Sequence, residues 1–215
     1  MEKYKIIIAD DHPIIHIGVD MVLKKSGIFY ELESIYNGHD LIELLNKNTY
    51  DLLLLDINMS GSQSIEDTEN IIRKNPKTKV VIYSQLPEKL YVMHYLKIGA
   101  YGYIDKTIDD GKFLEIILTI LNGKKYFSQT AKELILNSSD TSARSSNKNI
   151  NPFLQLSIRE LEVARCLKMG YDYKQIADKL QISTSTISTY KSRIFEKLNI
   201  KTLSDFFDLV HQYTI

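Results

Sequence analysis

The stretch YDLLLLDINMSG, from Tyr50 to Gly61, decides how the first half of the chain folds. Its four consecutive leucines form an unbroken apolar run that ends at the carboxylate of Asp56. Such a run is typical of a strand that is buried on both faces, as in a parallel sheet flanked by helices. Sheets of this kind bind ligands beyond their strand ends, so Asp56 is the first candidate for chemistry.

Similar apolar runs recur before and after this stretch and alternate with helical patterns. Residues 4–11, 30–36, 51–56, 79–84 and 100–104 predict strands, and residues 12–27, 40–47, 64–75, 88–99 and 110–123 predict helices. This alternation predicts an α/β fold, a doubly wound five-stranded parallel sheet with right-handed crossovers. We assign the fold to residues 1–126.

Polar side chains follow four of the predicted strands. They are Asp10 and Asp11 after the first strand, Asp56 after the third, Ser84 at the end of the fourth and Lys106 just beyond the fifth. Because the carboxyl ends of parallel strands meet at one edge of a sheet, we expect these side chains to converge. Taken singly, each has a plainer interpretation, since a strand-end aspartate is usually a turn residue or a helix cap.

Together these residues predict a phosphoryl-transfer site. Three close carboxylates repel one another and favour a hard divalent cation such as Mg²⁺, which takes oxygen ligands. The metal and the ammonium of Lys106 would neutralise phosphoryl oxygens, and Ser84 would donate a hydrogen bond to one of them. One carboxylate would attack phosphorus and form an acyl phosphate. His12 and His16 are spaced to share a metal on a helix, but without a third His or Cys we expect no such site.

Composition excludes several classes of protein. No apolar run approaches the ~20 residues that a membrane span needs, and the first residues do not have the layout of a signal peptide, so we expect a cytoplasmic protein. The single cysteine, Cys166, excludes an internal disulfide framework and any cysteine-rich metal site.

A polar stretch separates two halves of opposite charge. Residues 137–152 read NSSDTSARSSNKNINP, which cannot bury enough apolar surface to offset the entropy lost on ordering, so we expect a flexible linker within residues 127–152. Residues 1–126 carry 15 basic and 18 acidic side chains, whereas residues 127–215 carry 12 and 9. The basic side chains gather in residues 174–201, which alone fits a solvated helix face as well as nucleic-acid binding.

The chain after the linker predicts a small all-α helix-turn-helix domain over residues 153–215. Ser157 and Glu160 have the spacing of a capping box at the start of a first helix. A short helix over 173–180, a tight turn and a longer helix over 184–198 follow, which is the helix-turn-helix layout.

The longer helix has an apolar face and a small polar face. Ile187, Tyr190, Ile194 and Leu198 fall on the side of the core. The opposite side fits a major groove, where hydroxyls bond to base edges and cations meet phosphates, although an ordinary solvent-facing helix remains an alternative. The candidate DNA-binding residues are Ser185, Ser188, Thr189, Lys191, Ser192 and Arg193, with Lys174 and Lys197.

The first half closely resembles the receiver domain of two-component response regulators. The resemblance rests on the phrases IADDHP and GAYGYIDK and on the order of Asp10, Asp11, Asp56, Ser84, Tyr103 and Lys106. It implies that Asp56 accepts a phosphoryl group from a sensor histidine kinase. It also implies that Mg²⁺ is bound by Asp10, Asp11, Asp56 and the main-chain carbonyl of Asn58. It also implies that Ser84 and Tyr103 rearrange as a switch pair. Ser60 departs from the family, which usually has proline there.

The second half resembles the LuxR-type helix-turn-helix in the phrases LSIRELEV, KQIADKLQIS and TISTYKSRIFEKL. Joined to a receiver, it indicates the NarL/FixJ class of response regulators, with TISTYKSRI most similar to regulators of the EvgA, BvgA and FimZ kind. The class implies a transcription regulator that binds promoter DNA as a homodimer, with RNA polymerase as a candidate partner. It implies no enzyme activity beyond phosphorylation and slow dephosphorylation at Asp56. Many members have a basic residue at the position of Ser188.

Two other functions remain open at this point. A DNA-binding protein with a silent receiver would keep the same acidic residues without using them. An aspartyl-phosphate phosphatase would also use a strand-end aspartate, typically on the first strand and with a second acid two residues on. Asn58 occupies that place relative to Asp56.

Overall fold

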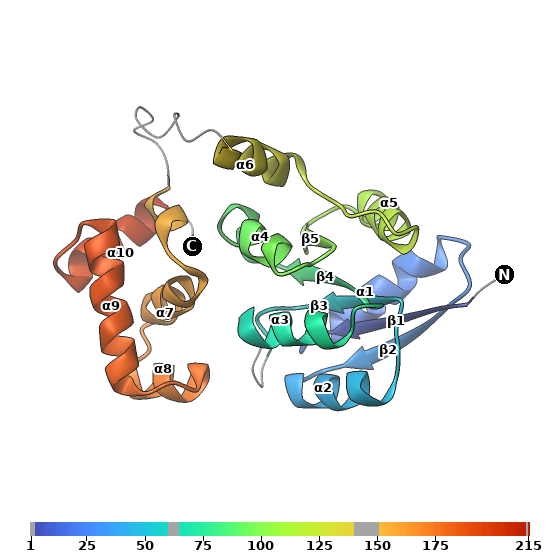
Figure 1. Cartoon of the computed structure of the whole chain (residues 1–215), viewed down its shortest axis with the longest axis horizontal. Helices are drawn as coiled ribbons and strands as arrows, with labels where there is room; N and C mark the ends of the chain where they lie inside the picture. The colour runs from blue at the N-terminus through green and yellow to red at the C-terminus, as the bar shows by residue number, and fades with distance from the viewer. Residues whose placement is uncertain (1–2, 60–64, 140–150, 214) are drawn as a thin grey trace. The chain divides into compact units, whose positions relative to one another are not determined.

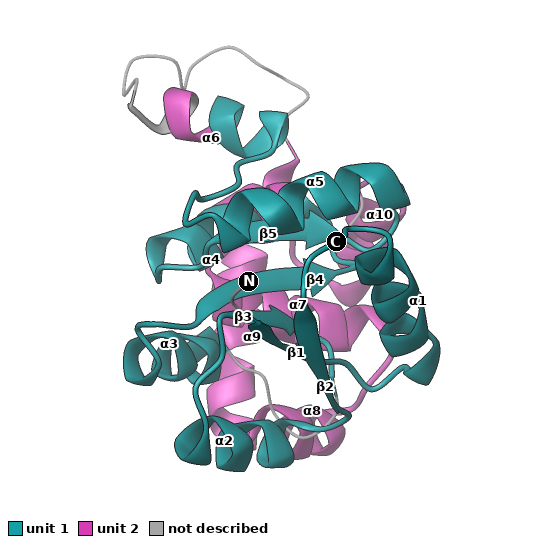
Figure 2. Cartoon of the chain, turned by 90° about the vertical axis from the view of Figure 1, so that its right-hand side faces the viewer, with its two compact units in different colours: residues 1–88, 92–133 teal, residues 89–91, 134–215 magenta. Residues whose placement is uncertain are grey.

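The computed structural model describes residues 3–59, 65–139, 151–213 and 215. Its chain divides into two compact units, coloured separately in Figure 2. The N-terminal unit comprises residues 1–88 and 92–133, and the C-terminal unit comprises residues 134–215, with residues 89–91 grouped with it. Ser60, the predicted departure from the receiver pattern, lies outside the described residues.

The N-terminal unit is the predicted alternation of strands and helices (Figure 1). Its elements are β1 (Tyr4–Ala9), α1 (Pro13–Lys24), β2 (Tyr30–Ile35), α2 (Gly38–Lys47), β3 (Leu52–Leu55), α3 (Ile65–Lys74), β4 (Lys79–Ser84), α4 (Glu88–Lys97), β5 (Gly102–Asp105) and α5 (Asp110–Leu121). The strands form one parallel sheet in the order β2-β1-β3-β4-β5. The predicted doubly wound five-stranded sheet is confirmed.

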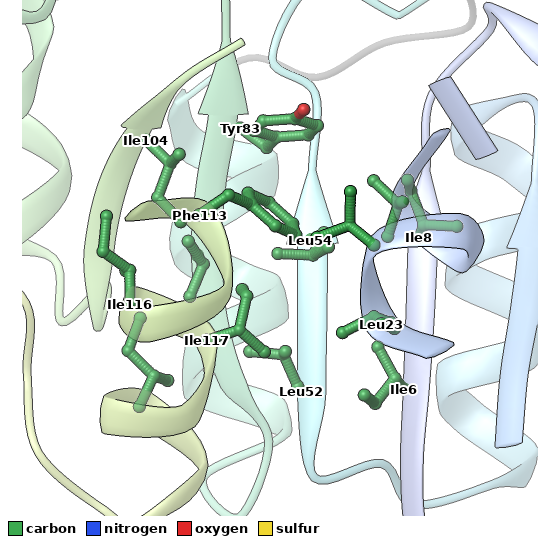
Figure 3. Close-up of a cluster of buried hydrophobic side chains, with 14 of the residues drawn as sticks. Ile6, Ile8, Leu23, Leu52, Leu54, Tyr83, Ile104, Phe113, Ile116 and Ile117 are labelled. Carbon is green, nitrogen blue, oxygen red and sulfur yellow. The ribbon is translucent and has the colours of Figure 1, made fainter. Parts of the chain in front are cut away.

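Helices cover both faces of this sheet, with α1 and α5 on one side and α2, α3 and α4 on the other (Figures 1 and 2). Figure 3 shows the core under α1 and α5, where Leu52 and Leu54 lie with Phe113 and Leu23. Successive side chains of a strand point to opposite faces, so Leu53 and Leu55 enter the other core, and all four leucines are fully buried. Burying each contributes about 1.5–3 kcal/mol, which explains the unbroken run.

The register of the sheet brings the strand ends to one edge. Ala9 pairs with Leu55, and Ser84 pairs with Asp105. Beyond these pairs the main chain stays connected, because the N–H of Asp56 donates to the carbonyl of Ala9 at 2.9 Å and the N–H of Lys106 donates to that of Ser84 at 3.0 Å. The predicted site residues therefore start from neighbouring points.

The structure differs from the expected linker over its first part. Residues Gln129–Ser139 form a helix, α6, and the boundary between the two units falls inside it, beyond the expected domain end at residue 126. Ser128 fixes its start by accepting from the N–H of Ala131 at 3.0 Å and donating to a carboxylate oxygen of Glu88 at 2.6 Å. The most polar part of the predicted linker, residues 140–150, lies outside the described residues.

In the described part of the C-terminal unit after α6, every regular element is a helix. It consists of a short 3₁₀ turn, η1 (Pro152–Gln155), and helices α7 (Ile158–Lys168), α8 (Tyr173–Leu180), α9 (Thr184–Leu198) and α10 (Leu203–Gln212). The predicted capping box of Ser157 and Glu160 is confirmed, and both helices of the predicted helix-turn-helix have the expected bounds. Gln181 permits the tight turn by adopting a left-handed conformation with φ of 53°.

Cys166 is buried in α7, as expected of a core residue, and burial raises the pKa of its thiol. Across the described residues of both units, no helix is long and apolar enough to cross a membrane.

Candidate functional site

The carboxylates predicted at the strand ends do converge. Asp10, Asp11 and Asp56, together with His12, place one ligand atom each within 4.8 Å of one another. Asp10 and Asp56 are almost fully buried, with 1% and 3% of their surface exposed, whereas Asp11 is half-buried. We refer to Asp10, Asp11 and Asp56 as the acidic pocket.

Lys106 reaches into the acidic pocket from the end of β5. Its ammonium lies 2.6 Å from Asp10 Oδ2 and 2.9 Å from Asp56 Oδ2, and its side chain is only 4% exposed. Three carboxylates with one ammonium leave a formal charge of −2. A hard divalent cation matches that charge and the all-oxygen donor set of the three aspartates, so the residues present fit Mg²⁺.

The environment of Asp56 sets the protonation of its carboxyl group. Burial raises the pKa of Asp56, the ammonium of Lys106 and the main-chain N–H of Asn58 oppose that rise, and the charge of Asp10 adds to it. The N–H of Asn58 donates to Asp56 Oδ1 at 3.0 Å. That bond turns the loop after β3 back towards the carboxylate. The predicted role of the Asn58 carbonyl as a metal ligand remains a prediction.

Two histidines hold the acidic pocket in ways that the sequence did not reveal. The Nδ1 atom of His12 lies 3.0 Å from Asp10 Oδ1 and 2.9 Å from Asp11 Oδ1. His16 is buried, and its Nε2 atom bonds to the main-chain carbonyl of Asp10 at 2.8 Å. The two imidazoles therefore have different partners. Their spacing suggested only a shared metal, whereas the position of His12, directly after the two aspartates and before a helix-starting Pro13, was the available signal.

Ser84 and Tyr103, the predicted switch pair, meet at one peptide segment. The N–H of Leu86 donates to Ser84 Oγ at 3.2 Å, and the Tyr103 hydroxyl donates to the carbonyl of Leu86 at 2.9 Å. Both side chains are buried, with 1% and 2% exposed. The Tyr103 hydroxyl therefore has a polar partner in the loop between β4 and α4.

Helix α9 presents the predicted polar face to solvent. Ile187, Ile194 and Leu198 are buried, and Tyr190 is half-buried. The four predicted hydroxyl residues are all exposed, and we call them the hydroxyl face: Ser185, Ser188, Thr189 and Ser192.

The predicted basic residues divide into two that are exposed to solvent and two whose ammonium groups contact other side chains. Lys174 and Arg193 are exposed. Lys191 is half-buried, with its ammonium 5.6 Å from the ring centroid of Tyr173 and 5.2 Å from that of Phe195. The Lys197 ammonium lies 2.7 Å from the buried carboxylate of Glu160, so the structure gives it a packing role between α7 and α9. Its DNA contact remains a prediction.

Comparison with known proteins identifies the two units. Residues 6–118 match the family described as "Response regulator receiver domain", and residues 154–210 match "Bacterial regulatory proteins, luxR family". The chain belongs to the NarL/FixJ class of response regulators. The predicted family and its function as a transcription regulator are thereby confirmed.

Two relatives from Staphylococcus match this response regulator over most of its sequence. The oxygen regulatory protein NreC of Staphylococcus carnosus is 30% identical over 200 residues, and the match covers 92% of each chain. NreC of Staphylococcus aureus strain RF122 is 32% identical over 204 residues, with the same coverage.

RcsB of Salmonella supports the fold of the response regulator. An RcsB structure concerned with conformational dynamism for DNA interaction is 22% identical, covers all of both chains and gives a TM-score of 0.78. A second RcsB structure, bound to promoter P1flhDC in the presence of phosphomimetic BeF3−, is 23% identical, covers 99% of this chain and 100% of that chain, and gives a TM-score of 0.73.

Proposed function

We propose that this response regulator accepts a phosphoryl group on Asp56 from a sensor histidine kinase in the cytoplasm and then binds promoter DNA as a homodimer. The observation that carries the proposal is the acidic pocket with Lys106 at 2.6 and 2.9 Å from two of its carboxylates. RNA polymerase is a further proposed partner of the DNA-bound form. We place a linker between the units, beginning with α6 and continuing to residue 152.

The chemistry at Asp56 is an in-line transfer. A carboxylate oxygen of Asp56 forms a bond to phosphorus while the bond to the donor's leaving atom breaks, and that atom departs with the electron pair. Asp10, Asp11, Asp56 and the main-chain carbonyl of Asn58 would hold Mg²⁺, which would supply positive charge for the phosphoryl oxygens. Lys106 supports the transfer twice, because it opposes the rise in the pKa of the buried Asp56 carboxyl group and then pairs with the new phosphoryl group.

The pocket communicates with the rest of the receiver through Ser84. Its hydroxyl now accepts from the N–H of Leu86 and is proposed to turn towards a phosphoryl oxygen, which releases one of the two bonds that hold this segment. Tyr103 holds the other bond, so the two side chains bias the position of the loop that leads into α4. The C-terminal unit then binds DNA with α9 in the major groove.

Intact mass after incubation with acetyl phosphate tests the phospho-acceptor. We expect one phosphoryl adduct on the wild type in the presence of Mg²⁺ and none after chelation of Mg²⁺ or in Asp56→Asn. Asp51→Asn is the matched control at the opposite end of β3, where Asp51 accepts from the N–H of Lys5 at 2.8 Å. Equal labelling of Asp56→Asn and Asp51→Asn would refute the assignment. A wild type that takes up no phosphoryl group would favour a silent receiver.

A further inference from the structure

Two of the four hydroxyl groups of the hydroxyl face already act as donors within α9. The Thr189 hydroxyl donates to the main-chain carbonyl of Ser185 at 3.1 Å, and the Ser192 hydroxyl donates to that of Ser188 at 3.0 Å. A carbonyl can only accept, so in each pair the hydroxyl proton points back into the helix. The lone pairs of both oxygens are left on the exposed side, and these two members of the hydroxyl face therefore offer acceptors to a ligand.

The cations of α9 stand away from the middle of this face. The Lys191 ammonium is drawn over the rings of Tyr173 and Phe195, and Arg193 is exposed beside the face. None of the four residues of the hydroxyl face is basic. Guanine is most often read in the major groove by Arg or Lys, which donate to its O6 and N7 atoms. The middle of the hydroxyl face has no group that makes this contact.

Base pairs differ in what they offer to such a face. Adenine presents the N6 amino group as a donor, and its partner thymine adds a methyl group. A G·C pair also has one donor, on cytosine, and two acceptors, as an A·T pair does, but it has no methyl group. Thr189 carries both an acceptor oxygen and a methyl group, which match the amino group of adenine and the methyl group of thymine.

We infer that the hydroxyl face of α9 reads an A·T base pair through Thr189, whose hydroxyl oxygen accepts a hydrogen bond from the adenine amino group and whose methyl group contacts the methyl group of thymine. The inference rests on the proposed function, in which α9 enters the major groove. Lys174 and Arg193 lie outside the face and bind phosphates, which positions the helix without selecting a sequence.

Selection from a random double-stranded library tests the inference with the full-length, phosphorylated protein at one fixed salt concentration. Wild type and Ser188→Lys are selected in parallel, because a lysine at the centre of the face adds a donor and shifts the preference at the positions that the face reads. We expect A·T at those positions for the wild type and a gain of guanine for Ser188→Lys. Guanine at those positions in the wild type would overturn the inference alone. Failure of the wild type to enrich any sequence would overturn the proposed DNA binding and the inference with it.

Modified DNA then separates the two contacts of Thr189. Replacing the selected adenine by purine, which lacks the amino group, should weaken wild-type binding about fivefold, as expected for one neutral hydrogen bond. Thr189→Val keeps the methyl group of threonine and has a second methyl group in place of the hydroxyl, so it should bind both DNAs equally. Thr189→Ser keeps the hydroxyl and should become insensitive to replacement of thymine by uracil. Ser204→Ala, at an exposed serine of α10, is the matched control and should behave as the wild type. Equal wild-type affinity for adenine and purine DNA would contradict the inference.

Discussion

Replacing Lys106 by methionine keeps an unbranched side chain of similar length and removes the ammonium that lies between Asp10 and Asp56. Both carboxylates are buried and would face each other without a counter-charge. Removing one partner of a buried ion pair costs about 3–5 kcal/mol. Asp56 can reduce this cost by taking up a proton, because burial already raises its pKa, so we expect about 3 kcal/mol at neutral pH without Mg²⁺.

Hydrogen exchange in the full-length protein measures this loss within the N-terminal unit. Amides of β1 and β3 report on global opening of the sheet, and a loss of about 3 kcal/mol corresponds to roughly hundredfold faster exchange. Amides of α7 and α9 in the C-terminal unit provide an internal reference. Lys112→Met is the matched control, because the Lys112 ammonium is exposed and pairs with the exposed Glu115, so its removal should leave the exchange rates unchanged.

Two conditions should restore stability to Lys106→Met. Mg²⁺ should stabilise this variant more than the wild type, because it supplies the missing positive charge and binds only the folded pocket. Lower pH should also reduce the difference in stability between Lys106→Met and the wild type. A carboxyl whose folded pKa is raised is destabilising only above its unfolded pKa, and the effect disappears when both states are protonated. Exchange in Lys106→Met as slow as in Lys112→Met would refute the view that the ammonium stabilises the acidic pocket.

Three further variants test contacts elsewhere in the chain. Burial alone would raise the pKa of Glu160, but the Lys197 ammonium and a main-chain N–H outweigh burial and lower it. The contribution of Glu160 to the stability of the C-terminal unit should therefore be fully present above about pH 4.5 and fall as the pH drops through the lowered pKa. In unfolding followed by circular dichroism, Glu160→Gln should lose the part of the stability that falls with acid. The same pH dependence of stability in Glu160→Gln and wild type would contradict this role of Glu160. Tyr103→Phe removes the hydroxyl bond to Leu86, so the amides of this loop should lose about 1 kcal/mol of protection and exchange faster. Unchanged exchange in this variant would mean that the hydroxyl bond does not stabilise the loop. Ser128→Ala removes a cap worth about 1 kcal/mol, so α6 amides should exchange faster while those of α5 do not, and equal rates in variant and wild type would contradict the capping role.

Local pattern was sufficient for the regular elements because their burial is periodic along the chain. The run from Leu52 to Leu55 identified a strand buried on both faces, and the bounds of α8 and α9 followed from helical spacing around a short turn. The convergence of Asp10, Asp56 and Lys106 also followed from topology, because parallel strands end at the same edge.

Contacts between distant residues were not accessible in this way. The basic character of residues 174–201 made Lys197 a candidate for DNA binding. Its partner Glu160 belongs to another helix, and only the packing of α7 on α9 brings the two side chains together. Helix α6 was missed for a related reason. An isolated helix of this length is marginal in water, and its start depends on the bond between Ser128 and Glu88, which are 40 positions apart.

Ser84 and Tyr103 both hydrogen-bond to the main chain of Leu86 and not to its side chain, since Ser84 accepts from the N–H and Tyr103 donates to the carbonyl. Every amino acid except proline supplies the same N–H and carbonyl. The leucine side chain can therefore be replaced by any side chain except that of proline while both hydrogen bonds remain available to the switch.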